Sequence, residues 1–540
     1  MRMAFALLFA LAAWAAAPLA VSHEPSEFEA QCSNLHRLRD VTIIHTDFTV
    51  EEGESPEHCY AKGLINGSIT FHIYLPVASA WNGRLVHLGD GGADGDLDSN
   101  PLLLQQGYAI VNSNTGHDTG AEPRAYAFDN ERAAKDFSYW AVHTSTAAGK
   151  AVVRAHYGQP HEYAYHYGCS TGGRQALIAA QLFPFDFDGI VAGAPGHRQF
   201  QRMAHRLSVE QHLFREDLKA NLAFDADGDG VQESLAKLDL LADVVMRKCD
   251  AADGIEDNIL EPELCDFEVE RDLKAHVCRA GRDTEDCFTQ AQLGAISHLY
   301  EGSRKSNGEL VYPGAPLGSE RQWSGVFIPH KGNQFTPYVL RSASAVIGYS
   351  FYDDDPGLIP PDLSDVGYAL DTDAALPEWG WWNFDIDDVG SNRMSAQAPM
   401  MEGTDPDLDR FFFRNGGKLL MYHGWADAVI PPEPTIEYHQ SVIDYLFKGN
   451  RQKASEHMQL FMAPGVAHCR GGPGPDRADY LGALRAWVEE GKQPSQITAR
   501  HYTDGTMDNE RILCPYPTRA VLTSTSNDAS QWRAENFACE

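Results

Sequence analysis

One short stretch, residues 162–183, constrains the fold more than any other part of the chain. It reads EYAYHYG, then CS, then TGGRQALIAAQLF: a strand-like run, a cysteine–serine pair and a run with helical spacing. Gly168 and Gly172 flank Ser170 in the pattern G-x-S-x-G, whose glycines permit the sharp strand-to-helix turn that exposes a serine nucleophile. A glycine-rich turn without chemistry is the alternative. The strand before the motif and the helix after it favour the nucleophile.

The alternation of strand and helix continues on both sides of this stretch. Strand-like runs begin at residues 70, 84, 108, 187, 418 and 458, and a helical run covers 138–158. Such alternation predicts an α/β fold, with helices on both faces of a sheet. Residues 197–405 break the rhythm with acidic segments and long loops, so we predict an insertion there. The catalytic domain is then 23–196 and 406–540, and an insertion at the strand ends would cover the ligand crevice as a lid.

The N-terminus has the pattern of a secretory signal peptide. Residues 1–22 contain an early arginine, an apolar run, and the small residues Ala20 and Ser22 before the expected cleavage point. The apolar run is short for a membrane span, which makes an N-terminal anchor the less favoured alternative. We therefore predict an exported protein, secreted or periplasmic. Its formal charge of −33 argues against nucleic-acid and membrane partners, because phosphate groups would be repelled.

Export changes the interpretation of the ten cysteines. An even count in an oxidising compartment favours a disulfide framework. Structural zinc is the alternative, but the sequence contains no C-x-x-C pair.

A serine nucleophile needs a histidine base and an acid that orients the histidine. In α/β-hydrolases these follow in the order Ser, Asp or Glu, His. The strand-like run KLLMYHG leads into WADAVIPP, which contains Asp427, and MQLFMAPG leads into VAHCRGG, which contains His468. Cys469 follows His468 directly, just as Cys169 precedes Ser170. If these two cysteines pair, one disulfide holds the serine and histidine loops together.

The combination of GCSTGGRQ, YHGWADAVIPP and PGVAHCRGGPG resembles the tannase and feruloyl esterase family, which also contains a bacterial hydrolase of mono(2-hydroxyethyl) terephthalate. WNGRLVHLGDGG, FDGIVAGAPG, WWNFDIDD and LCPYP extend the resemblance over nearly the whole mature chain. It implies an α/β-hydrolase sheet with a large inserted lid domain. It also implies a catalytic serine and histidine joined by a disulfide of their neighbouring cysteines.

The resemblance implies a role for each residue of the site. Ser170 would be the nucleophile, His468 the base and Asp427 its orienting acid. The backbone N–H groups of Thr171 and Gly92 would form the oxyanion hole, with Gly91 as the alternative to Gly92 because GDGG departs from the wording of the family. His423 would line the substrate pocket. The same resemblance supports five disulfides: Cys169–Cys469, Cys32–Cys59, Cys249–Cys265, Cys278–Cys287 and Cys514–Cys539.

A structural calcium site is expected in the insertion, within CDAADGIEDNIL. Asp250, Asp253 and Asp257 are spaced so that one tight loop can turn three hard oxygen ligands inward, although a solvated acidic loop is the alternative. The resemblance adds the carbonyls of Ile255 and Ile259 as ligands. A second segment, DADGDGVQE, places Asp225, Asp227, Asp229 and Gly230 like the start of an EF-hand, but Ala236 stands where the loop needs a glutamate. The family does not require that loop.

These observations predict a secreted serine hydrolase that cleaves small esters of aromatic acids, of feruloyl or galloyl type, through an acyl-enzyme. Trp379, Trp381 and Trp382 in the insertion are expected either to stack on the acyl ring or to belong to the core. Terephthalate monoesters are an alternative substrate, and a serine peptidase shares the chemistry without family support. From another class, the chain would be a non-catalytic calcium-binding surface protein.

Overall fold

The computed structural model describes residues 26–540 except for 52, 94, 96, 98, 119–125, 127–129, 215–217, 230, 280–281, 334–337, 349–380, 392–397 and 524–531. The predicted signal peptide, Gly230 and Trp379 therefore lie outside the described residues.

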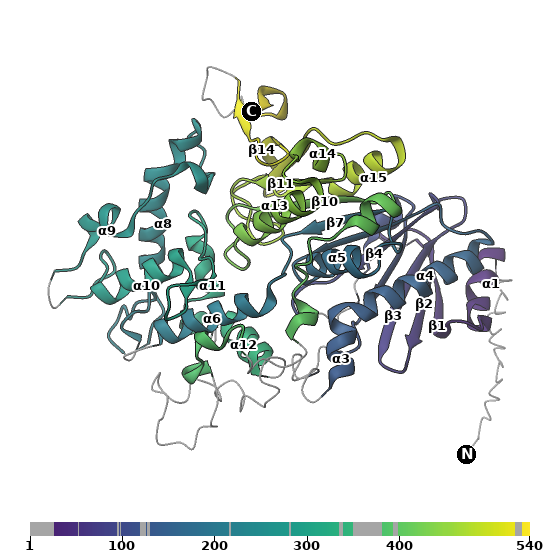
Figure 1. Ribbon diagram of the computed structural model, residues 1–540, viewed down its shortest axis with the longest axis horizontal. Coiled ribbons are helices and arrows are strands. Elements are labelled where there is room, and N and C mark those ends of the chain that lie inside the picture. Colours follow the sequence, from purple (N-terminus) through teal and green to yellow (C-terminus); the bar gives the residue numbers. More distant parts are fainter. Residues whose placement is uncertain are drawn as a thin grey trace, which may run out of the picture.

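A nine-stranded sheet forms the centre of the catalytic domain (Figure 1). Its spatial order is β1-β2-β3-β5-β4-β6-β7-β10-β11. The pairs from β1 to β5 are antiparallel, and those from β5 through β4 to β11 are parallel. The strands are β1 (Thr42–Thr49), β2 (His58–Ile65), β3 (Ile69–Pro76), β4 (Arg84–Gly89), β5 (Ala109–Ser113), β6 (Tyr163–Cys169), β7 (Gly189–Gly193), β10 (Lys418–Gly424) and β11 (Met458–Ala463).

Helices cover both faces of this sheet, as the alternating sequence predicts. Successive residues of a strand point to opposite faces, so Ile190 packs into the core with α5 and α13 while Val191 packs into the core with α2 and α15. Central strands buried on both sides read as near-continuous apolar runs, which explains FDGIVAGAP. The helices of this domain are α1 (Glu27–Asn34), α2 (Pro101–Gln105), α3 (Glu131–Lys135), α4 (Ala141–Tyr157), α5 (Thr171–Leu182), α13 (Glu433–Phe447), α14 (Arg451–Ser455) and α15 (Tyr480–Glu490).

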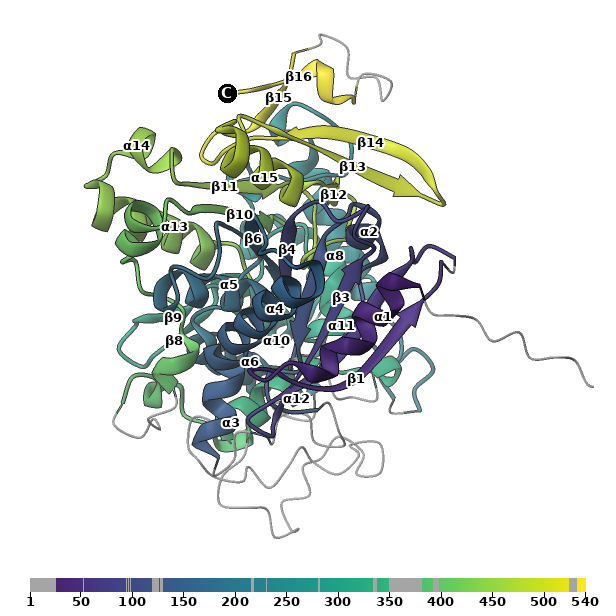
Figure 2. The ribbon, with the colours of Figure 1, turned by 90° about the vertical axis from the view of Figure 1, so that its right-hand side faces the viewer.

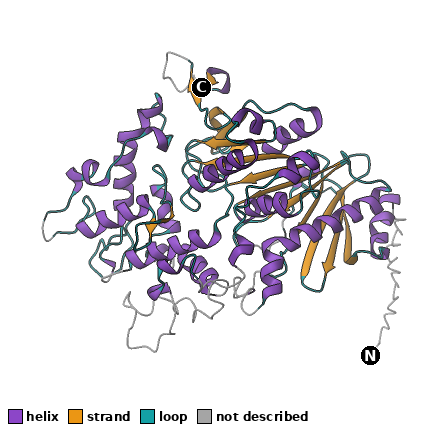
Figure 3. Cartoon of the chain, in the orientation of Figure 1, coloured by secondary structure: helices purple, strands orange, loops and turns teal. Residues whose placement is uncertain are grey.

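The insertion leaves the sheet after β7 and returns at β10, which is the parallel neighbour of β7. It lies to one side of the sheet and is mainly helical (Figures 1 and 3). A core of its own surrounds the fully buried Trp323, so it packs as a unit. Its principal elements are α6 (Gln199–Leu213), α8 (Ala236–Cys249), α9 (Val269–Asp272), α10 (Gln290–Glu301), β8 (Ser303–Arg304), β9 (Leu310–Tyr312), α11 (Trp323–Val326) and α12 (Tyr338–Ala345).

The C-terminal segment adds two small antiparallel sheets beside the catalytic domain (Figure 2). Both pack against the insertion, because Ile255 shares a buried cluster with Ile512 of the three-stranded sheet and with Ala520 and Phe537 of the two-stranded sheet. These last strands are β12 (Arg477–Ala478), β13 (Ile497–Thr503), β14 (Thr506–Leu513), β15 (Ala520–Leu522) and β16 (Phe537–Cys539).

All ten cysteines form disulfides, and each predicted pair is confirmed. The Cα–Cα distances, from 4.9 to 6.0 Å, lie in the range that disulfides require. Among the described residues, no helix is both long enough and apolar enough to cross a membrane.

Candidate active site

Ser170 occupies a strained turn between β6 and α5. Its φ of 63° and ψ of −120° lie outside the regions that L-residues prefer. Backbone hydrogen bonds hold the turn: the Ser170 N–H donates to the Gly193 carbonyl at 3.0 Å, and the Ser170 carbonyl accepts from the Gly196 N–H at 2.8 Å. Strain of this kind persists only where the surroundings fix it, and it is concentrated at functional sites.

Close backbone contact explains the two flanking glycines. A Cβ on Gly168 would lie 2.6 Å from the backbone of Gly172, and a Cβ on Gly172 would lie 2.6 Å from the carbonyl oxygen of Gly89. The first residues of α5 therefore pack directly on the ends of β4 and β6. This contact projects Ser170 beyond the sheet at the carboxyl end of its strand.

Asp427 and His468 follow the next two strands, β10 and β11, and they meet. The Nδ1 atom of His468 lies 2.7 Å from Asp427 Oδ2, and the Asp427 side chain is completely buried. Its other oxygen accepts the N–H groups of Val429 at 2.9 Å and Ile430 at 2.8 Å. Burial alone would raise the pKa of Asp427, but His468 and His423 beside it hold that pKa well below its usual range. An ionised carboxylate only accepts, so Nδ1 of His468 donates and Nε2 is left as the base.

The insertion holds the Asp427 loop from the other side. Arg206 in α6 donates to the Val429 carbonyl at 2.7 Å, and Gln322 donates to the Ala426 carbonyl at 2.5 Å. Ala428 is itself part of the core of the insertion. Misplacing catalytic groups by about 1 Å costs about a hundredfold in rate, so these contacts matter for the chemistry as well as for folding.

The prediction that His423 lines the pocket is wrong. Its side chain is completely buried, with Nε2 2.8 Å from the Ile430 carbonyl and 3.3 Å from Asp427 Oδ2, and Nδ1 2.8 Å from the Thr435 hydroxyl. It follows Tyr422 on β10, and Tyr422 lines the cavity, so the alternation of side chains along the strand turns His423 to the opposite face of the sheet. His423 instead contacts the carboxylate of Asp427 and helps to hold it in place.

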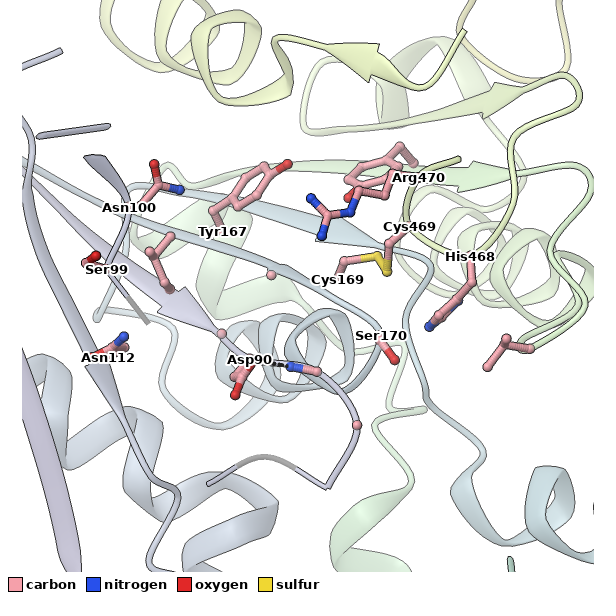
Figure 4. Close-up of a pocket in the computed structure, with 17 residues that line it drawn as sticks. Asp90, Ser99, Asn100, Asn112, Tyr167, Cys169, Ser170, His468, Cys469 and Arg470 are labelled. Carbon is pink, nitrogen blue, oxygen red and sulfur yellow. Dashed lines mark hydrogen bonds between the residues drawn. A yellow bond between two sulfur atoms is a disulfide. The ribbon is translucent and has the colours of Figure 1, made fainter. Parts of the chain in front are cut away.

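The Cys169–Cys469 disulfide joins the serine and histidine loops at a Cα–Cα distance of 6.0 Å. Ser170 and His468 each neighbour one of its cysteines, and the His468 ring points toward Ser170 (Figure 4). The structure thus brings together all three residues predicted for the triad.

The glycine loop after β4 contributes the second wall of the site. The Thr171 hydroxyl donates to the Gly92 carbonyl at 2.7 Å, which fixes this loop against the first turn of α5. Thr171 is the first residue of that helix, so its N–H has no partner within the helix. The Gly91 N–H donates to Asp90 Oδ1 at 2.7 Å, and this favours Gly92 over Gly91 as the second oxyanion donor.

A cavity of about 590 Å³ extends from Ser170 along the ends of β4, β5 and β6 (Figure 4). Sequence reasoning missed most of its polar wall. Tyr167 could have been expected from its place two residues before Cys169 on the same strand. The wall comprises Asp90, Ser99, Asn100, Asn112, Tyr167 and Arg470.

Trp381 and Trp382, the two described members of the predicted set of three tryptophans, do not line this cavity. Trp381 is 2% exposed and packs against Phe214 at 5.1 Å between ring centroids, and Trp382 packs on the same core. Of the two roles expected for these residues, the structure therefore supports membership of the core for Trp381 and Trp382 and not stacking on the acyl ring.

The loop predicted to bind calcium follows α8 and contacts the C-terminal strands. Asp253 and Asp257 are buried, and both face Arg511 of β14, which is ion-paired with Asp257 and lies 3.6 Å from Asp253. Asp250 Oδ1 accepts the N–H groups of Asp257 and Asn258, which closes the loop. Through this loop the insertion contacts β14 of the C-terminal segment.

Burial raises the pKa of the three aspartates predicted as calcium ligands. The effect is seen at Asp250, Asp253 and Asp257, and the pKa of the neighbouring Glu261 rises to about 7. The guanidinium groups of Arg511 and Arg519 oppose this rise in pKa at Asp253 and Glu261. The half-buried Asp250 and the buried carboxyl groups of Asp253, Asp257 and Glu261 face two positive charges, which leaves an excess of negative charge that a divalent cation would neutralise. The chemistry of the donors therefore fits calcium.

The second acidic loop brings its carboxylates closer together. Among the described residues, Asp225, Asp227 and Asp229 form the one group of three potential ligands with oxygens within 4.8 Å of one another. Asp227 and Asp229 are exposed. Ala236, at the position that needs a glutamate, begins α8 and offers no side-chain ligand.

The sheet, the serine turn and the His468–Asp427 pair define a carboxylic ester hydrolase of the α/β-hydrolase fold. The family model described as "Tannase and feruloyl esterase" matches residues 57–539. The chain belongs to the tannase and feruloyl esterase family.

Relatives and solved structures agree with this assignment. The chain is 28% identical to a mono(2-hydroxyethyl) terephthalate hydrolase of Piscinibacter sakaiensis, over 91% of this chain and 86% of that one. It is also 28% identical to a probable feruloyl esterase B-1 of Aspergillus flavus, over 87% and 84%. The crystal structure of feruloyl esterase B from Aspergillus oryzae superposes with a TM-score of 0.75 at 23% identity, covering 95% of this chain and all of that one. This superposition supports the fold.

Proposed function

We propose that the protein hydrolyses esters of aromatic carboxylic acids through an acyl-enzyme on Ser170. The observation that carries the proposal is the His468–Asp427 pair, held beside the strained Ser170 by the Cys169–Cys469 disulfide. Ser170 Oγ forms a bond to the ester carbonyl carbon as its proton passes to Nε2 of His468. The carbonyl oxygen becomes an oxyanion that accepts from the N–H groups of Thr171 and Gly92. Such donors contribute about 3 kcal/mol each to transition-state stabilisation.

The second half of the reaction reverses these transfers. When the tetrahedral intermediate collapses, the bond to the alkoxy oxygen breaks and His468 returns its proton to the departing alcohol. Water then attacks the acyl group on Ser170, His468 accepts a proton from that water, and the acid is released with Ser170 restored. Asp427 keeps the imidazole oriented and stabilises its charged form.

The names of the family and of its members make feruloyl or galloyl esters the favoured substrates of this protein. Terephthalate monoesters are the alternative. We expect the purified protein to hydrolyse at least one of methyl ferulate, methyl gallate and mono(2-hydroxyethyl) terephthalate, with product acid measured by chromatography. Comparison of kcat/KM across the three identifies the preferred class. Failure to hydrolyse any of them, in calcium-loaded and folded protein, would contradict the proposal.

We further propose that calcium binds at Asp250, Asp253 and Asp257, with the carbonyls of Ile255 and Ile259. The excess of buried carboxylates in this loop supports the site, and its position at the C-terminal sheet gives it a structural role. Neutralising Asp253 and Asp257 there would secure the insertion against β14.

Removal of calcium should therefore lower the thermal stability of the protein. A ligand bound only by the folded state stabilises it by about 2.7 kcal/mol when its free concentration is a hundredfold above Kd. Exhaustive chelation should lower Tm, and added calcium should restore it. Asp253→Ala should remove the response, whereas Asp227→Asn, in the other acidic loop, should retain it. An unchanged Tm after chelation of the wild type would exclude the site.

Export to an oxidising compartment forms part of the same proposal. Disulfides persist outside the cytosol, and all ten cysteines of this chain are paired. The signal-peptide pattern of residues 1–22 supports secretion or a periplasmic location.

A further inference from the structure

Arg470 occupies a distinctive place on the wall of the active-site cavity. It is the one lysine or arginine among the described residues that line the cavity, and Asp90 is the one acidic residue (Figure 4). Arg470 follows the disulfide directly, so the same covalent link that holds His468 beside Ser170 also holds the backbone of Arg470 there.

A tight turn presents this side chain to the cavity. Cys469 has a left-handed φ of 64°, and the Arg470 N–H donates to the His468 carbonyl at 2.8 Å. The turn brings His468, Cys469 and Arg470 to the cavity wall in succession. The left-handed conformation costs free energy in a residue other than glycine, as it does at Ser170, so the surrounding contacts must hold this turn in place.

The guanidinium group of Arg470 is exposed and forms no ion pair within 4.0 Å among the described residues. Other arginines of the chain are differently placed: Arg84 is paired with Glu489 and Arg511 with Asp257. The acidic residue across the cavity, Asp90, accepts the Gly91 N–H with its Oδ1 oxygen. Arg470 is thus available to a ligand.

The phenol groups of Tyr167 and Tyr422 lie near the guanidinium group of Arg470. Burial raises the pKa of Tyr167 and of Tyr422, and the nearby Arg470 opposes both shifts, so its guanidinium lies within electrostatic range of both hydroxyls. The two tyrosines are hydrogen-bonded to each other and remain protonated at neutral pH. A guanidinium beside protonated hydroxyls offers several hydrogen-bond donors to one ligand, which suits a carboxylate.

We propose that Arg470 is a specificity-determining residue that binds a carboxylate of the ester substrate. This inference rests on the proposed function, because it concerns which esters Ser170 attacks. The formal charge of −33 repels anionic substrates from the protein as a whole, so a local cation beside the nucleophile is what would admit them. The carboxylate belongs either to the acid portion or to the alcohol portion of the ester.

Two pairs of esters of matched shape test the proposal and distinguish these sources. In the first pair, monomethyl terephthalate carries the carboxylate on the acid portion, and methyl 4-nitrobenzoate replaces it with a neutral nitro group. In the second, 4-carboxyphenyl benzoate carries it on the alcohol portion, with 4-nitrophenyl benzoate as its neutral partner. For each enzyme the ratio of kcat/KM, charged over neutral, is measured. Arg470→Ala should lower this ratio about tenfold in one of the pairs, the effect of losing a charge-assisted hydrogen bond.

Arg470→Gln and Arg470→Lys separate charge from packing. The glutamine variant keeps most of the side-chain bulk and should lower the ratio as alanine does, whereas lysine should restore much of it. Arg477→Ala is the matched control, since Arg477 stacks over the Tyr502 ring at 4.9 Å, outside the cavity, and its ratio should equal that of the wild type. The inference is wrong if the alanine and glutamine variants hydrolyse the neutral esters and have the same ratios as the wild type in both pairs. That result would leave the proposed function intact. A wild type that hydrolyses none of the four esters would overturn the proposed function and this inference together.

Discussion

Ser170→Ala should lower kcat for every ester substrate by roughly four to six orders of magnitude, because the variant has no atom that can form the acyl-enzyme. The fold should be unaffected, since the turn is held by backbone hydrogen bonds from Ser170 to Gly193 and Gly196 and not by the hydroxyl. Steady-state kinetics on the preferred ester and thermal unfolding of the same samples measure the two effects. Ser455→Ala, which removes the hydroxyl of a half-buried residue on α14 that does not line the cavity, is the matched control and should leave kcat unchanged.

The three residues should also behave as one unit. His468→Ala leaves the serine without a base, so the Ser170→Ala, His468→Ala double variant should be little worse than either single variant. Asp427→Asn should lower kcat by about four orders of magnitude, because an amide at that position favours the wrong tautomer of His468. Near-normal turnover by a folded Ser170→Ala protein would refute the assignment of the nucleophile. Additive losses in the double variant would refute the shared mechanism.

The parts of the site that the sequence predicts correctly are those in which local and global signals coincide. Ser170 could be located because the glycines, the preceding strand and the following helix all require the same turn. Asp427 and His468 could be located because each follows a strand of a parallel sheet, and the carboxyl ends of such strands share one edge. Cys469 then provided an independent link to Cys169.

The remaining features depend on contacts between distant segments, which no local pattern encodes. The burial of His423 was not predictable from alternation along β10, since both faces of a central strand are covered. Arg206 reaches Val429 across 223 residues, and Arg511 reaches Asp257 across 254. Trp381 belongs to the core because it packs against Phe214, a contact between residues that are far apart in the sequence. Each of these is decided by tertiary packing.

Loss of the Cys169–Cys469 disulfide should impair catalysis more than loss of any other disulfide. The link lies between residues that directly neighbour Ser170 and His468, and Cys469 adopts a left-handed conformation that the disulfide helps to fix. Without it the histidine loop can shift relative to the serine turn, and a displacement of about 1 Å at that contact costs about a hundredfold in rate. Replacing both cysteines with alanine should therefore lower kcat by about two orders of magnitude. The Cys514→Ala, Cys539→Ala variant is the matched control and should retain most of its turnover, because that pair joins strands away from the triad.

The same pair of variants separates catalysis from stability. The chain-entropy model assigns about 5.7 kcal/mol to a link that spans 300 residues and about 3.5 kcal/mol to one that spans 25, so both variants should unfold at lower temperature. Stability loss alone would lower activity near Tm in both, whereas displacement of the triad lowers kcat only in the Cys169, Cys469 variant and at temperatures well below Tm. Equal kcat losses in the two variants, measured where both are fully folded, would show that the disulfide next to Ser170 serves only stability. A selective loss would show that it positions the nucleophile and its base.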